Sequence, residues 1–86
     1  MDINSLNLII EKKISQKISC QKIAVENKTY LHKKHKGHEK NKFHIKLIIK
    51  SDELLKMNRI ESTKKIYKIL DYELKYYIHS IEVLLN

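Results

Sequence analysis

The sequence is poor in residues that bend or crosslink a chain. Among its 86 residues there are no prolines and no tryptophans, one glycine and one cysteine. The single cysteine, Cys20, cannot form an internal disulfide, which is typical of a protein from a reducing compartment. We expect Cys20 to be a small, largely buried side chain rather than a reactive thiol.

Long apolar runs are also missing. No stretch approaches the ~18 residues that a membrane-spanning helix needs. The N-terminus carries an acid, Asp2, where an export signal would begin with positive charge. The composition contains no linker and no repeat. Residues 1–86 are therefore predicted to form a single domain in the cytoplasm, with no membrane contact.

Groups that would support catalysis are scarce. The sequence has no glycine-rich phosphate loop and no serine or cysteine beside a candidate base. Its adjacent acids, Asp52 and Glu53, are more simply the start of a helix. We therefore expect a protein that is not an enzyme and that holds no cofactor when alone.

The positive charge is concentrated in one stretch, from Lys28 to Lys50. This stretch holds four of the five histidines and the only glycine, and it carries +7 of the total formal charge of +8. Clustered charge of this kind usually meets an anion, a metal or an acidic protein surface. The function is expected to lie in or near this stretch.

The first half of the chain predicts a helix followed by two strands. Apolar residues recur at spacings of three and four over residues 3–18, as on one face of an amphipathic helix, and Asp2 or Asn4 could cap it. Residues 21–27 alternate in the manner of a short strand. The polar residues 28–42 form a loop in this interpretation, and residues 43–50 form a half-buried strand with a basic solvent face.

The second half predicts a helix and a last strand. Ser51 offers a helix cap, and helical spacing then continues for about five turns through Met57, Ile60, Lys64, Tyr67, Leu70 and Leu74. Residues 71–77 leave room for a short extra helical turn. The apolar run at residues 78–85 predicts a final strand. A three-stranded sheet covered on one side by helices is the economical α+β arrangement for this order.

Three blocks of the sequence form a recognisable pattern. The first, from Thr29 through His32 to His35, has the form Ser/Thr-x-x-His-x-x-His. The second is His44-Ile45 with Ser51 and Leu54 after it, and the third runs from Glu73-Leu74 to Ile78-His79-Ser80-Ile81. Together with Ile66-Tyr67 and Leu70, the pattern extends from about Val25 to Val83, and in order and spacing it resembles the BolA family of small stress-associated proteins.

The resemblance implies a class II KH-like fold, α-β-β-α-(α)-β, with a three-stranded mixed sheet and helices packed on one face. It also implies a non-enzymatic adaptor that binds a monothiol glutaredoxin and takes part in iron–sulfur cluster assembly, trafficking or iron regulation. A [2Fe–2S] cluster would be shared in that complex. The protein is expected to be a monomer when alone.

The resemblance implies His32 as one [2Fe–2S] ligand. The family's second ligand is taken to be a helix histidine, and Thr63 occupies that position here. A threonine hydroxyl is a poor ligand for iron in such a cluster. His35 and His79 are alternative ligands, and His44 or a water molecule could also substitute. Alternatively, the two proteins could form a complex without a shared cluster.

The histidines also have simpler interpretations. His44 and His79 each lie in a predicted strand, where an imidazole could donate to a backbone carbonyl and fill the core edge. His32, His35 and His38 would then be solvated loop side chains, although three imidazoles could also bind a metal ion.

The lysines support an alternative function, that of a DNA-binding transcriptional regulator of the stress-response type. Electrostatic contact with phosphates is expected of a domain with this charge. However, the sequence lacks the Gly-x-x-Gly loop of KH domains, and its tyrosines at residues 67–77 are expected to pack rather than to stack on bases. The candidate partner- or nucleic-acid-binding residues are Lys33, Lys34, Lys36, Lys46 and Lys50.

Overall fold

Three strands form one mixed sheet in the computed structural model, which describes residues 1–29 and 42–86. The strands are β1 (Lys22–Asn27), β2 (Phe43–Lys50) and β3 (Ile78–Leu85), in the order β1-β2-β3. β1 is antiparallel to β2, and β3 is parallel to β2. The parallel pair requires a crossover, and the helices of residues 52–76 carry the chain from the end of β2 back to the start of β3.

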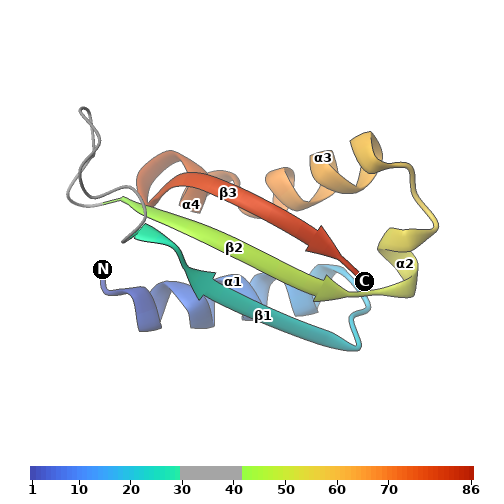
Figure 1. Ribbon diagram of the computed structural model, residues 1–86, viewed down its shortest axis with the longest axis horizontal. Helices are drawn as coiled ribbons and strands as arrows, with labels where there is room; N and C mark the ends of the chain where they lie inside the picture. Colours follow the sequence, from blue (N-terminus) through green and yellow to red (C-terminus); the bar gives the residue numbers. More distant parts are fainter. Residues whose placement is uncertain (30–41) are drawn as a thin grey trace.

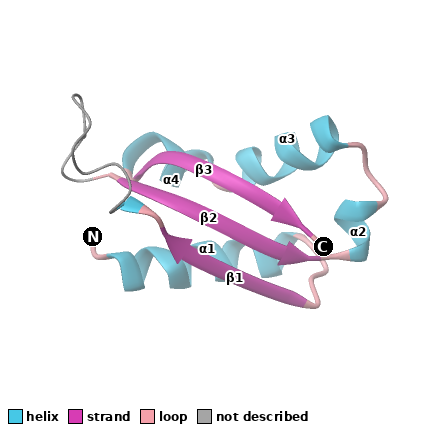
Figure 2. Cartoon of the chain, in the orientation of Figure 1, coloured by secondary structure: helices cyan, strands magenta, loops and turns pink. Residues whose placement is uncertain are grey.

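Four helices accompany the sheet: α1 (Ile3–Lys17), α2 (Asp52–Leu55), α3 (Arg59–Ile69) and α4 (Asp71–Tyr76). They lie together on one face of the sheet, as Figures 1 and 2 show. This arrangement confirms the predicted α+β fold. No helix in residues 1–29 or 42–86 is long and apolar enough to cross a membrane.

Helix α1 begins where its sequence offers a cap. The Asp2 carboxylate accepts a hydrogen bond of 2.8 Å from the Ser5 N–H, which would otherwise have no partner in the first turn. This hydrogen bond also lowers the pKa of Asp2. The predicted apolar face is confirmed, because Leu6, Ile10 and Ile14 are fully buried against the sheet.

The core lies between the helices and the inward face of β2. Ile45, Leu47 and Ile49 alternate with less buried residues and are at most 2% exposed. This two-residue alternation confirms the predicted inner face of the strand. The other buried apolar residues come from α1, its C-terminal cap and the segment after β2: Leu6, Ile10, Ile14, Ile18, Leu54, Ile66, Leu70 and Ile78.

The prediction of one continuous helical face from Met57 to Leu74 was wrong. The chain forms α2, turns, and starts again at α3, where the Asn58 side chain accepts a hydrogen bond of 2.9 Å from the Glu61 N–H. The inward face of α3 consists of Ser62 and Ile66, whereas Ile60 is 68% exposed. Two further residues of the predicted face, Lys64 and Tyr67, are also exposed, and Leu70 is buried as predicted.

A buried serine explains this shift of the inward face. The Ser62 hydroxyl donates to the Arg59 carbonyl at 3.1 Å, so its polar atom is satisfied inside the helix. A pattern of apolar residues could not reveal this, because serine counts as polar. The predicted extra helical turn near residues 71–77 is confirmed as α4.

The tyrosines near α4 divide between the surface and the edge of the core. Tyr72 is 55% exposed and Tyr76 48% exposed, and their ring centroids lie 4.8 Å apart. Tyr77 is partly buried and packs against the core, with its ring centroid 6.0 Å from that of Tyr72. The expectation that these side chains pack is therefore confirmed for Tyr77 and was wrong for Tyr72 and Tyr76 as far as the core is concerned.

An ion pair fastens α4 to α1. Glu73 is 3% exposed, and its two carboxylate oxygens accept hydrogen bonds of 2.9 and 2.7 Å from the Lys13 Nζ. A buried carboxylate without a partner is strongly unfavourable. The Lys13 ammonium also lies 5.9 Å from the centre of the Tyr72 ring.

Replacing Lys13 by methionine is expected to lower the free energy of unfolding by about 2 kcal/mol, because Glu73 would lose its charge partner. Lys13 is partly exposed, so the effect should fall below the roughly 3–5 kcal/mol typical of fully buried pairs. Urea denaturation measures it. Lys12→Met removes the same charge from an exposed position of α1 and should change the stability by less than about 0.5 kcal/mol; equal losses in both variants would contradict the assignment.

Candidate functional site

Three chain segments meet where β1 ends and β2 and β3 begin. We call this place the loop edge and define it by the His44, His79 and Ser80 side chains with the backbone of Lys28 and Thr29. The Lys28 N–H donates to the His44 carbonyl at 2.7 Å, and the His44 N–H donates to the Thr29 hydroxyl oxygen at 3.2 Å. The last described residues before the basic segment are thus fixed beside His44.

The pairing of β2 with β3 is irregular at this edge. Phe43 pairs with Ile78, but the next residue, His44, pairs with Ser80. His79 is therefore an extra residue in β3, as in a β-bulge, and it has no pairing partner in β2. Bulges re-aim side chains, and this one lets β3 bury Ile78 while Ser80 shares the face of His44.

His44 is a structural residue of the loop edge. Its side chain is 7% exposed, and its Nδ1 and the Ser80 hydroxyl share a hydrogen bond of 2.6 Å. The predicted structural role of His44 is confirmed, with a serine hydroxyl as a partner.

His79 differs from this prediction. Its ring centroid lies 4.8 Å from that of His44, with the ring planes tilted by 52°, but the residue is exposed. The prediction that His79 fills the core edge was wrong, because the bulge places it outside the regular alternation of the strand. The loop edge therefore presents one exposed imidazole supported by one buried imidazole.

Charged side chains surround a small hollow beside the His44 imidazole. The hollow has a volume of about 210 Å³ and is lined by Lys28, His44, Lys46, Ser80 and Glu82, among others. The Lys28 ammonium lies 3.7 Å from the Glu26 carboxylate. Of the predicted binding lysines, Lys46 thus lies next to the loop edge.

Lys50 lies elsewhere. It ends β2, pairs with Lys22 of β1 and lines a separate hollow of about 410 Å³ with Ala24 and Ile48. Four residues of a strand span about 13 Å, so Lys46 and Lys50 cannot contact the same small group. The two lysines that were predicted to form one basic surface on this strand therefore belong to two separate hollows.

Thr63 is remote from the loop edge. It projects from α3 into a hollow that it lines with Leu55 and with Val83 and Leu84 near the end of β3. His79 stands at the start of the same strand, about 13–16 Å away along its length. The position that the resemblance implies for the helix ligand, occupied here by Thr63, therefore lies near the end of β3 opposite to His79.

Five of the predicted site residues lie outside the described residues: His32, Lys33, Lys34, His35 and Lys36. Their roles stay predictions. Within residues 1–29 and 42–86, no group of three or more His, Cys, Asp or Glu side chains is placed to hold a metal ion.

Cys20 lies outside the loop edge, between α1 and β1. It is partly buried, and its thiol donates to the Ile18 carbonyl at 3.5 Å. Burial raises the pKa of the Cys20 thiol, and the nearby Glu53 carboxylate raises it further. Both effects disfavour the reactive thiolate, in agreement with the expected structural role.

The bulge is the feature that the sequence interpretation missed. A regular strand would place its buried residues at even spacings, but the half-buried or buried residues of β3 are Ile78, Ile81, Val83 and Leu85. The step of three from Ile78 to Ile81 marks one extra residue between them. This spacing could have indicated that His79 leaves the regular pattern.

Comparison with known proteins establishes the family to which this chain belongs. Residues 14–85 match the sequence profile of the BolA-like protein family. The chain belongs to the BolA family. The order of its elements, the mixed sheet and the matched segment agree with the resemblance that the histidine and serine blocks carry.

Three similar proteins show how much of the chain the matches cover. A BolA protein of Haemophilus influenzae, described as a DNA-binding transcriptional regulator, is 31% identical over 77 residues, covering 90% of this chain and 72% of the relative. The BolA domain of SufE1 from Arabidopsis thaliana superposes with a TM-score of 0.81 at 25% identity, covering 99% of this chain and 94% of the other. BolA1 from Arabidopsis thaliana shares the fold, with a TM-score of 0.77 at 18% identity and coverage of 92% and 87%.

The two neighbouring histidines are expected to respond differently to replacement. His44→Ala should lower the free energy of unfolding by about 1–2 kcal/mol, because it removes a buried ring and its hydrogen bond. His79→Ala should change it by less than about 0.5 kcal/mol, because the ring is exposed. Urea denaturation of both variants measures the difference, and similar losses would contradict the assignment of a structural and an exposed imidazole.

Proposed function

We propose that this BolA-like protein is a non-enzymatic adaptor that binds a monothiol glutaredoxin and shares a [2Fe–2S] cluster with it. The observation that supports the proposal is the bulge at the loop edge, which leaves the His79 imidazole exposed beside the buried His44. Imidazole serves as a ligand in [2Fe–2S] centres of the Rieske type, so the donor chemistry of His79 fits the group.

In this proposal His79 and His32 are the two ligands from this chain. His32 follows Thr29 by three residues, and a chain spans at most about 3.6 Å per residue. Because the Thr29 hydroxyl oxygen accepts the His44 N–H, that short connection starts at the loop edge. Position 63, at the other end of β3, takes no part, so Thr63 is compatible with cluster sharing.

A [2Fe–2S] cluster takes four ligands, so a monothiol glutaredoxin and the glutathione bound to it would supply the other two. Such a cluster is cargo held between two proteins rather than a resident cofactor. The protein would accordingly hold no cluster when alone. Lys33, Lys34 and Lys36 would attract the carboxylates of the partner and of glutathione.

His79→Ala is expected to change the visible absorbance and circular dichroism of the complex reconstituted anaerobically with a monothiol glutaredoxin, iron and sulfide. The fold should persist, because His79 is exposed. His32→Ala should have a comparable effect and His35→Ala a smaller one. A wild-type spectrum for His79→Ala would remove it from the ligand set.

Thr63→His provides the matched control for the location of the second ligand. An imidazole at position 63 would face Val83 and Leu84, away from His79, so the spectrum should stay unchanged. A new spectrum would contradict the loop-edge assignment. A complex on a sizing column without any cluster spectrum would indicate docking without a shared cluster.

A second candidate function is DNA-binding transcriptional regulation. It is supported by the description of the Haemophilus influenzae relative and by the formal charge of +8. Described lysines that could contact phosphates include Lys22 and Lys50, which pair at one end of the sheet.

Titration of a promoter duplex and a scrambled duplex at physiological salt tests this candidate. Specific regulation predicts that the promoter binds at least about tenfold more tightly than the scrambled duplex. Affinities that are equal for both sequences and fall together as salt rises would reduce the interaction to non-specific phosphate contact. Lys50→Gln should weaken binding in either case, because it removes one phosphate contact.

A further inference from the structure

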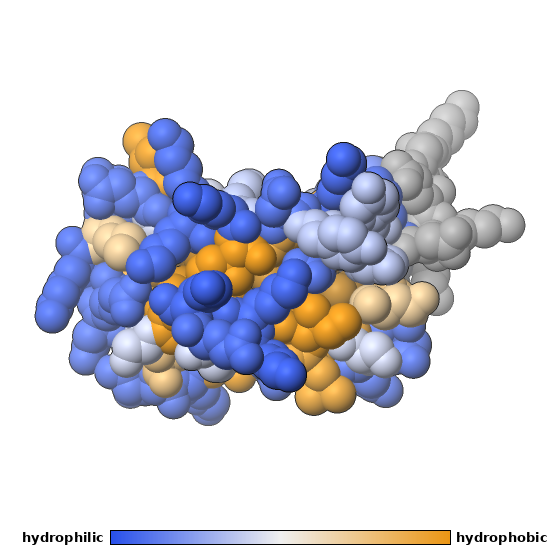
Figure 3. Space-filling view, turned by 180° about the vertical axis from the view of Figure 1, so that it is seen from behind, coloured by the Kyte–Doolittle hydropathy of each residue, from blue (hydrophilic) through white to orange (hydrophobic). Residues whose placement is uncertain are grey.

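A hollow of about 600 Å³ opens between α1 and α3, on the helical face of the sheet and away from the open face that carries His44. Seen from behind in Figure 3, apolar surface is exposed along the middle of this face between hydrophilic surfaces on both sides. The volume lies in the range of small-molecule sites, about 300–1,000 Å³. Its lining residues are Lys13, Gln16, Lys17, Lys65, Lys68 and Ile69.

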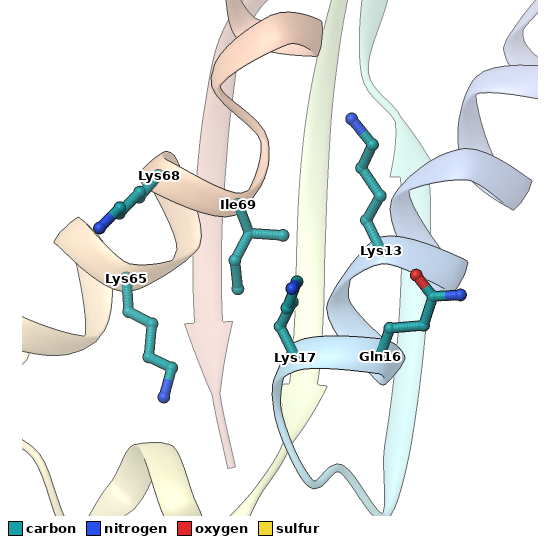
Figure 4. Close-up of a pocket in the computed structure, with 6 residues that line it drawn as sticks. All are labelled: Lys13, Gln16, Lys17, Lys65, Lys68 and Ile69. Carbon is teal, nitrogen blue, oxygen red and sulfur yellow. The ribbon is translucent and has the colours of Figure 1, made fainter.

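The floor and the walls of this hollow differ in chemistry. Figure 4 shows Lys13 and Lys17 on the wall formed by α1, Lys65 and Lys68 on the wall formed by α3, and Ile69 between the two helices. Ile69 is only partly buried and packs against the core. The hollow thus combines an apolar floor with a rim of four ammonium groups.

Two of the four rim lysines are already neutralised. Lys13 is paired with Glu73 at 2.7 Å. The Lys65 ammonium donates to the Glu53 carboxylate at 2.8 Å, and this hydrogen bond lowers the pKa of Glu53. Both contacts show that carboxylates can reach ammonium groups at this rim.

The other two lysines, Lys17 and Lys68, have no carboxylate within 4 Å among residues 1–29 and 42–86. Both are exposed, and they approach the hollow from opposite walls. Neighbouring like charges repel each other, so a bound anion would relieve an unfavourable interaction present in the empty protein. The rim therefore carries two positive charges that an external anion can balance.

We propose that this hollow binds a small amphiphilic carboxylate of the fatty-acid type. The carboxylate would lie between Lys17 and Lys68, and the acyl chain would cover Ile69. The inference does not depend on the proposed cluster-binding function, because the loop edge contributes no residue to the hollow.

The charge and the chemistry favour this ligand over a nucleic acid. Lys13 and Lys65 are paired with carboxylates, so within residues 1–29 and 42–86 only Lys17 and Lys68 of the rim are left to bind an external anion. Two ammonium groups suit one anionic group better than a run of phosphates. A phosphate backbone also offers nothing apolar to cover Ile69. Charge and apolar contact together are what a fatty-acid anion supplies.

A chain-length series tests the apolar part of the proposal. Hexanoate, octanoate and decanoate, below their micelle concentrations, are titrated into isotopically labelled protein and followed by the amide resonances of Lys17 and Ile69. We expect the affinity to rise about two- to fourfold per methylene, because each buried methylene adds a transfer free energy. Affinity that is independent of chain length would overturn the proposal.

Head-group controls test the charged part. Decanol, which keeps the chain and lacks the charge, and inorganic phosphate, which keeps charge and lacks the chain, should each bind at least about tenfold more weakly than decanoate. Phosphate binding as tight as decanoate would mean a simple anion site and would overturn the proposal. Decanol binding as tight as decanoate would do the same.

Charge-matched variants locate the site. Lys17→Gln and Lys68→Gln should each weaken decanoate binding about fivefold, since each removes one ammonium contact. Lys12→Gln and Lys64→Gln remove the same charge from exposed positions of the same two helices outside the lining and should leave the affinity within about twofold. Equal effects in all four variants would indicate general electrostatic attraction and would overturn the proposal.

Discussion

The pairing of β2 with both of its neighbours is the constraint on which the rest of the structure depends. β2 is the central strand, and its Ile45, Leu47 and Ile49 are at most 2% exposed beneath the helices. A shift of one residue in either pairing would turn these side chains to the open face. The register with β1 therefore fixes where Lys28 and Thr29 meet His44, and the register with β3 fixes which histidine is exposed.

A single extra residue in β3 connects this constraint to the candidate site. The core requires Ile78 to face the helices, while the hydrogen bond to His44 requires Ser80 to face the other way. In a regular strand, residues two positions apart lie on the same face. Ile78 and Ser80 can therefore face opposite sides of the sheet only when His79 is left out of the pairing with β2. His79 is thus exposed because Ile78 packs into the core on the helical face while Ser80 forms a hydrogen bond with His44 on the open face.

The two faces of the molecule use lysine differently. On the helical face, Lys13 and Lys65 are engaged by carboxylates that tie α1 to α4 and α2 to α3, while Lys17 and Lys68 remain available at the rim of an apolar hollow. On the open face, Lys46 shares a hollow with His44 and Glu82 next to the loop edge, and Lys50 stands beside Lys22 at the far end. Net charge alone does not distinguish these environments, because a lysine acts on a ligand only where nearby carboxylates leave it unbalanced.

The sequence by itself determined the fold class, the family, the inner faces of α1 and β2 and the helix starts at Asp2 and Ser51. These features depend on local periodicity and on capping side chains, which a sequence displays directly. Tertiary structure decided the interruption at Asn58, the burial of Ser62, the bulge at His79 and the separation of Thr63 from the loop edge. It also decided that lysines far apart in the chain would share one hollow. These features arise because buried polar groups must find partners and strands must keep their register, and both conditions involve residues that are distant in the sequence.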